Sequence, residues 1–198
     1  MTTSRRRRTS GRSAAGARRR ASAPTLTVWF YDSAMGAAAG ELRLKELQQR
    51  GAVTVLDAVT IAWMTGAHTP RVGHLVHRRS TAPVEGSILG AFVDALLLAP
   101  AVGSGPAAEL EALAQGLLGT GIDRQFLADT RARLRPGTSA LLVLSADSDL
   151  DSVRLAIERG RARGDVTLMY ASLPPGAPAF LAQLLDPADR SSSGTCDR

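Results

Sequence analysis

The stretch from Gly86 to Gly121 constrains this chain most, because it is apolar and rich in glycine and alanine within an otherwise ordinary α/β pattern. A break at Pro100–Pro106 predicts two helices, over Thr81–Ala99 and Pro106–Gly119. Residues four apart share a helix face, and small residues recur at that spacing on both helices. These ridge residues are Gly86, Gly90, Ala108, Ala112 and Gly116. Ridges without large side chains let helices approach closely, which predicts a helical hairpin that packs against other helices.

The hairpin is too short and too charged to favour a full membrane crossing. The apolar run Ile88–Ala99 has 12 residues, whereas a spanning helix needs about 20. Asp94, Glu109 and Glu111 would also be costly in the hydrocarbon core. Three interpretations therefore stay open: association between copies of the chain, attachment to a membrane surface, and packing of the hairpin on the protein's own sheet.

The basic charge of the chain belongs to its N-terminal segment. The formal net charge is +6, yet residues 1–23 hold eight arginines and no acid, so the remainder of the chain carries −2. Three interpretations fit this segment: contact with nucleic-acid phosphates, contact with anionic lipid headgroups, or a solvated extension without a function. No aromatic residue lies among these arginines, so stacking on bases has no platform. The residues that would contact a polyanion or a headgroup are Arg5, Arg6, Arg7, Arg8, Arg18, Arg19 and Arg20.

The remaining pattern predicts one α+β domain over residues 25–186, between disordered tails at 1–24 and 187–198. Strands are expected at Leu26–Tyr31, Val53–Met64, Arg71–Arg78, Ser139–Ser145 and Val166–Ala171. Helices are expected at Ala34–Gln49, capped by Asp32 or Ser33, at Arg124–Leu134, capped by Asp123, from Asp149 or Asp151 to Arg159, and at Gly176–Leu185. This order predicts a ferredoxin-like βαββαβ core with helices on one face of the sheet and the hairpin inserted at about 81–120.

The sequence contains few candidates for catalytic chemistry. His74 and His77 are three apart on an expected strand, so they point to opposite faces and cannot share a metal. The alternating Asp147, Asp149 and Asp151 lack the glycine and glutamate of a calcium loop and suit helix capping better. No phosphate loop or nucleophile elbow is present, and Cys196 is the single cysteine. We therefore expect no catalytic, cofactor or metal residues, no small-molecule substrate, and a protein that is not an enzyme.

Three groups of residues resemble an uncharacterised bacterial and archaeal family, domain of unknown function 1269, whose members are often labelled membrane proteins. The first group is Gly121-Ile122-Asp123 with Phe126, followed by the run Arg135–Leu144. The second is Leu56-Asp57-Ala58-Val59 with Gly66. The third is the position of the Gly/Ala insert. The resemblance implies a ferredoxin-like body with a glycine-zipper insert and no known activity. It brings no catalytic or cofactor residues. This chain departs from the family because charges and prolines interrupt its insert.

These patterns favour a non-enzymatic homo-oligomer in the cytoplasm, with possible peripheral attachment to an anionic membrane and no secretion signal. One alternative is a nucleic-acid-associated protein that binds through the arginine-rich tail. A second alternative is a small-ligand sensor, which rests on analogy of fold alone.

Overall fold

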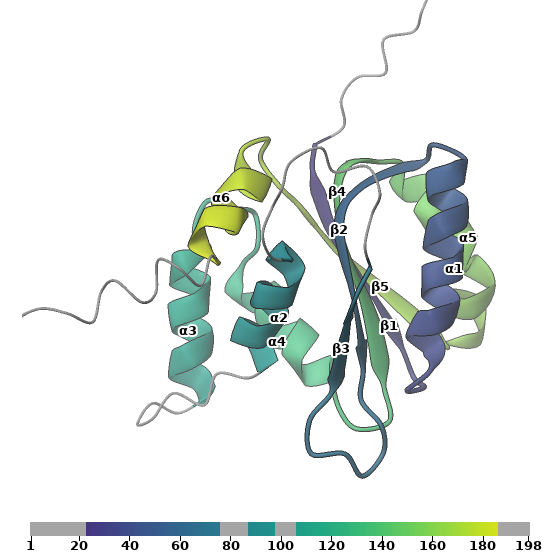
Figure 1. The fold of residues 1–198 in the computed structure, drawn as a ribbon, viewed down its shortest axis with the longest axis horizontal. Coiled ribbons are helices and arrows are strands. Elements are labelled where there is room, and N and C mark those ends of the chain that lie inside the picture. The colour runs from purple at the N-terminus through teal and green to yellow at the C-terminus, as the bar shows by residue number, and fades with distance from the viewer. Residues whose placement is uncertain (1–22, 76–86, 98–105, 186–198) are drawn as a thin grey trace, which may run out of the picture.

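The computed structural model describes residues 23–75, 87–97 and 106–185. It contains a five-stranded antiparallel sheet and six helices (Figure 1). The strands are β1 Thr25–Tyr31, β2 Val53–Ala62, β3 Arg71–His74, β4 Ser139–Ser148 and β5 Val166–Ser172. The helices are α1 Gly36–Gln49, α2 Ile88–Leu97, α3 Pro106–Gly116, α4 Arg124–Arg133, α5 Leu150–Arg163 and α6 Ala177–Leu184. The prediction of a mixed α+β fold is confirmed.

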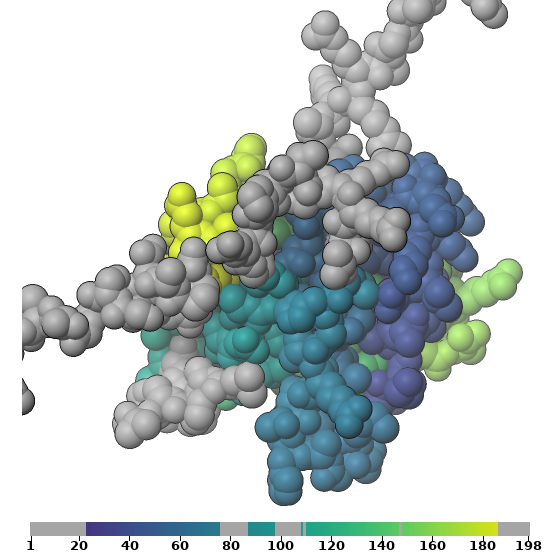
Figure 2. All heavy atoms as spheres, in the orientation of Figure 1, coloured from purple at the N-terminus to yellow at the C-terminus, as the bar shows by residue number. Residues whose placement is uncertain are grey.

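The strand order across the sheet is β3-β2-β4-β1-β5. All four neighbouring pairs are antiparallel, with β1 joined to β4 and β5 along its full length. The predicted hairpin between β2 and β3 exists, but β3 lies at the edge of the sheet and β4 occupies the position beside β1. β4 takes this central place because its run Ser139–Ser145 is buried throughout. Figure 2 shows that the turn between β2 and β3 projects from the body.

Helices cover both faces of the sheet, so the prediction of helices on one face is wrong. In Figure 1, α1 and α5 lie on one side and α2, α3, α4 and α6 on the other. The reason is the alternation along the central strands. On β1, Val28 and Phe30 join the core under the four-helix layer, whereas Trp29 and Tyr31 join the core under α1 and α5. Both faces are apolar and each needs a cover.

Most predicted helix ends are confirmed. Asp123 caps α4 by accepting from the Phe126 amide at 2.7 Å. Gly51 follows α1 with φ 69°, in the left-handed region that glycine tolerates. The predicted cap of α1 is wrong: its N-cap residue is Met35, which forms no side-chain cap. The hydroxyl of Ser139, at the start of β4, replaces it by accepting from the Ala37 amide at 2.9 Å.

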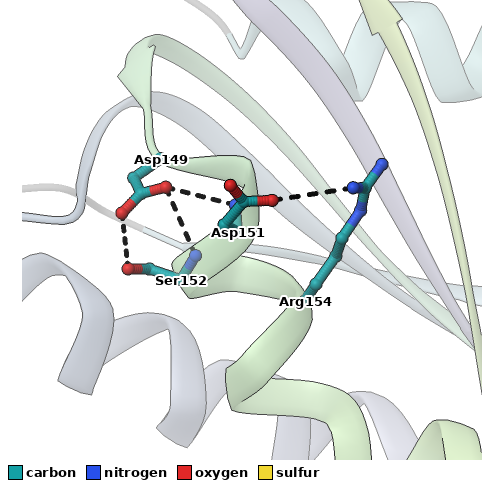
Figure 3. A network of polar contacts seen from close by, with 4 residues as sticks. All are labelled: Asp149, Asp151, Ser152 and Arg154. Carbon is teal, nitrogen blue, oxygen red and sulfur yellow. Dashed lines mark hydrogen bonds and ion pairs between the residues drawn. The ribbon is translucent and has the colours of Figure 1, made fainter.

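The aspartate-rich junction before α5 also behaves as a helix cap (Figure 3). The Asp149 carboxylate accepts from the backbone amides of Asp151 and Ser152, and from the Ser152 hydroxyl at 2.6 Å. Asp151 forms a 3.6 Å ion pair with Arg154 one turn later. The capping role expected for Asp149 is confirmed, and the Asp147 side chain lies outside the described residues.

Candidate self-association surface

Helix α2, the first half of the predicted hairpin, packs on the protein's own sheet. Its apolar side contacts β2 and β4, and four of its large side chains are buried: Leu89, Phe92, Val93 and Leu96. Burial of each such side chain is worth about 1.5–3 kcal/mol. This helix is therefore part of the core, in agreement with the third interpretation that the sequence left open.

Gly90 lies on this inward side of α2. A methyl group at its Cα would meet Cε1 of the exposed His74 ring on β3, so the ring would have to shift to make room for it. The other ridge glycine of this helix, Gly86, falls outside the described residues. A contact of this ridge with a second copy remains a prediction, and at Gly90 it would require His74 to move away.

Asp57 on β2 anchors the start of α2. Its carboxylate accepts from the Leu89 amide and from the Ser87 hydroxyl, both at 2.8 Å. The Ser87 oxygen in turn accepts from the Gly90 amide at 2.8 Å. Three polar hydrogens at the helix start are thereby satisfied, and the negative charge sits at the positive end of the helix dipole.

A β-bulge aims Asp57 at this helix. The pairing of β2 with β4 skips Leu56, because Val55 pairs with Ser145 and Asp57 pairs with Leu144. Val55 therefore faces α1, whereas Asp57 lies on the α2 side of the sheet. Without the extra residue, positions 55 and 57 would share one face. The sequence marked Asp57 only as part of a family motif; its capping role needed the bulge to be seen.

Helix α3, the second half of the hairpin, is the outermost helix of its layer and contacts α2 and α4 (Figure 1). Its inner side carries Ala114, which is buried, and Leu110 and Leu113, which are half-buried. Ala108 and Ala112 lie one turn apart on its exposed side. Gly116 is half-buried, and a methyl group there would be 3.7 Å from Leu184 of α6. Of the four ridge residues that the structure describes, Ala108 and Ala112 are exposed.

An open cleft adjoins the end of α3. Its volume is about 570 Å³, and its lining includes Leu118, Gly121 and Pro174. Leu118, two residues after the end of α3, is 68% exposed. Glu111 of α3 and Arg124 of α4 form a 2.9 Å ion pair at the wall of this cleft. The exposed Leu118 therefore lies in the turn after α3, and the exposed Ala108 and Ala112 lie on the helix itself.

A second, smaller cleft lies where β1 leads into α1. It has a volume of about 280 Å³, and its lining includes Tyr31, Arg43 and Arg163. The Tyr31 hydroxyl is buried and forms no hydrogen bond within the described part of the chain. Burial raises the pKa of Tyr31 to about 12, against the opposing effect of the nearby Arg43 guanidinium. The ring fits because the facing residues of α1 are Gly36 and Gly40. Helical spacing places Gly40 on the buried face of α1, but no local pattern indicates that Tyr31 packs on it.

The other predicted site residues are only partly placed. The arginines from Arg5 to Arg20, as well as His77 and Cys196, lie outside the described residues. Among residues 23–75, 87–97 and 106–185, no group of three or more His, Cys, Asp or Glu side chains is arranged to hold a metal ion. None of the helices in these ranges is both long enough and apolar enough to cross a bilayer.

Comparison with known proteins identifies a family but no characterised relative. The family model described as "Protein of unknown function (DUF1269)" matches residues 83–185, just over half of the chain. This range begins close to the start of the hairpin and includes both Gly121–Phe126 and Arg135–Leu144. The motif around Asp57 lies before it. No curated protein and no solved structure matches significantly. On the strength of the family match, the chain belongs to the family of proteins of unknown function DUF1269.

Proposed function

We propose that this protein is a non-enzymatic homo-oligomer in which the outer side of α3 packs against a second copy. The observation that carries the proposal is the exposure of Ala108 and Ala112, two small residues one turn apart on the side of α3 that faces away from the core. Two such helices can approach closely because alanine keeps their backbones uncovered. The exposed Leu118 supplies apolar area at the end of the same helix. The glycine zipper of the hairpin is then confined to α3, since Gly90 of α2 is used within the chain.

We also infer that the two halves β1-α1-β2 and β4-α5-β5 form a ferredoxin-like unit. Support comes from the strand order β2-β4-β1-β5, in which each helical connection skips one strand and all neighbours are antiparallel. In this assignment β3 and helices α2 to α4 together form the insertion between the halves. The insertion is longer than the hairpin at 81–120, because it includes the edge strand and the helix that ends at Arg133.

The test of self-association is the mass of the full chain in solution, measured by size exclusion with light scattering over a series of concentrations. Ala112→Leu should break the α3 contact, so the mass of the assembly should fall, with dissociation at concentrations about tenfold higher than for the wild type. Ala38→Leu is the matched control, since Ala38 is an exposed alanine on α1, on the other face of the sheet. A wild type that is monomeric at the highest concentration would refute the proposal.

A second candidate function is association with nucleic acid or anionic lipid through the first 23 residues. Its support is the separation of charge, with eight arginines and no acid in that segment. Deleting residues 1–23 should abolish binding to duplex DNA or to anionic vesicles, whichever the full chain binds. Binding that survives the deletion, or that does not weaken with salt, would refute this role.

A further inference from the structure

The two edges of the sheet are built differently. The β3 edge has four residues and includes Arg71, Gly73 and His74. A short edge with a charge is the usual protection against unwanted strand pairing. The β5 edge has seven residues, with the sequence VTLMYAS, and carries neither a charged residue nor a proline. Its register with β1 runs without a bulge from Val166 to Ser172. The β5 edge therefore lacks three of the devices that keep an edge strand from pairing.

Two backbone hydrogen bonds identify the groups that β5 leaves unpaired. The Leu173 amide donates to the Pro24 carbonyl at 2.8 Å, and the Asp32 amide donates to the Asp165 carbonyl at 3.4 Å. Odd-numbered residues of β5 thus direct their backbone groups toward β1. In an antiparallel strand the alternate residues direct theirs away. The outward groups belong to Val166, Leu168, Tyr170 and Ser172.

One end of this edge is covered within the chain. A methyl group at Gly121 would be 2.2 Å from the Ser172 carbonyl oxygen, so the turn between α3 and α4 lies against the end of β5. The free edge therefore extends from Val166 to Tyr170. Within the described ranges no other strand pairs with it.

We propose that β5 pairs antiparallel with β5 of a second copy, about a two-fold axis at Leu168. In this register Leu168 faces Leu168 of the other copy, and Val166 faces Tyr170 on either side of the axis. These three pairs exchange two hydrogen bonds each, so about six hydrogen bonds join the copies. The pairing avoids Ser172, which Gly121 covers. This inference rests on the proposed self-association and adds a second contact to it, because the β5 edge and the outer side of α3 are different surfaces.

A second copy suits this edge better than a charged partner does. β5 carries only apolar and hydroxyl side chains. The β5 strand of a second copy has the same length and the same lack of charge, so it matches this edge. Tyr170 is 46% exposed, with the Arg154 guanidinium 5.8 Å from the centre of its ring, so a large side chain is already held at the edge. Cross-strand contact with Val166 of the other copy would cover it. A two-fold pairing of this kind uses the same edge on both copies, so neither β5 edge remains free for a third copy.

Tyr170→Pro tests the pairing directly. Its amide points away from β1, so proline removes an outward donor without removing a hydrogen bond of the sheet. The matched control is Tyr170→Thr, which also removes the aromatic ring but keeps the amide. Both variants are made with Ala112→Leu, which removes the α3 contact. We then expect monomers for the proline variant and dimers for the threonine variant, with far-ultraviolet circular dichroism showing that both are folded.

A cross-linking experiment keeps the inference testable if the proline variant does not fold. In a Cys196→Ser background, Leu168→Cys should form a disulfide between copies on mild oxidation, because α-carbons in a hydrogen-bonded pair are about 5.5 Å apart. Ala38→Cys in the same background is the control and should stay unlinked.

The outcomes separate this inference from the proposed function. In the Ala112→Leu background, a folded proline variant that stays dimeric, or a threonine variant that is as monomeric as the proline variant, together with an unlinked Leu168→Cys variant, would overturn the β5 pairing. If Ala112→Leu alone then turns an oligomeric wild type into monomers, self-association through α3 stands. A monomeric wild type would overturn both. An Ala112→Leu chain that keeps the mass of the wild type, and loses its dimers when Tyr170→Pro is added, would assign the interface to β5 alone.

Discussion

Replacing Asp57 should show how strongly the sheet holds the start of α2. Asp57→Ala removes the acceptor for the Leu89 amide and for the Ser87 hydroxyl. Loss of a helix cap costs about 0.5–2 kcal/mol, and loss of the charge at the helix start costs about 0.3–1 kcal/mol. We therefore expect Asp57→Ala to lower the free energy of unfolding by about 2 kcal/mol. Asp57→Asn keeps an oxygen acceptor but loses the charge, so we expect about half of that loss.

Urea denaturation followed by tryptophan fluorescence measures this effect. Trp29 of β1 is fully buried under α1 and α5, so unfolding exposes its ring to water. With a slope of about 2 kcal/mol per molar urea, Asp57→Ala should lower the midpoint by about 1 M. Asp129→Asn, which removes an exposed carboxylate on α4, is the control and should change stability by less than about 0.5 kcal/mol. If Asp57→Ala matches that control, the cap contributes nothing and the reasoning fails. Deletion of Leu56 should be at least as harmful as Asp57→Ala, since it removes the bulge that aims the carboxylate.

Three further predictions concern other parts of the chain. Because burial raises the pKa of Tyr31 from 10.0 to about 12, the folded state favours the protonated phenol; its stability is intact below pH 10 and should fall by about 2–3 kcal/mol as the pH rises to 12. Tyr31→Phe should remove that part of the loss at alkaline pH. If the free energy of unfolding fell equally with pH in the wild type and in Tyr31→Phe, the prediction would be contradicted. Gly121→Ala should destabilise by more than about 2 kcal/mol in thermal or urea melts, since φ is 85° and the new methyl group meets the Ser172 carbonyl; Gly119→Ala, with φ 82° and open space, should cost less. Deletion of residues 1–23 should leave the urea midpoint unchanged while it abolishes any salt-dependent binding to DNA, and a lower midpoint would show that the tail stabilises the domain.

The sequence predicted individual elements well where one local signal was sufficient. The buried face of α1, formed by Ala37, Gly40, Leu44 and Leu47, follows from helical spacing alone. The Asp123 cap and the left-handed Gly51 follow from short-range rules. The cap of α1 was mispredicted because its partner, Ser139, lies 102 residues away in the chain. No local pattern contains that information.

The arrangement of the elements was harder to predict than their existence. Hairpin order suggested that β3 would be a core strand, but four residues with a half-buried pattern suit an edge. The run Ser139–Ser145 is recognisable as a strand from its apolar residues, yet its neighbours β1 and β2 cannot be named from its composition. Helices on both faces could have been foreseen from β1, since both Val28 and Trp29, adjacent and pointing to opposite faces, are large and apolar.

The interpretation of the Gly/Ala insert depends on which side of each helix the small residues occupy. From spacing alone, Gly90 and Ala112 are both predicted to pack against another helix, because each belongs to a small-residue ridge. The structure separates them: Gly90 makes room for His74 within the fold, whereas Ala112 faces outward. Asp57 fixes this difference, since a helix anchored at its start by a carboxylate from the sheet cannot rotate its inner side outward without losing the cap. The capped α2 therefore keeps its apolar side on the sheet. Helix α3 packs against α2, and its exposed side is the part of the insert that we propose to contact a second copy.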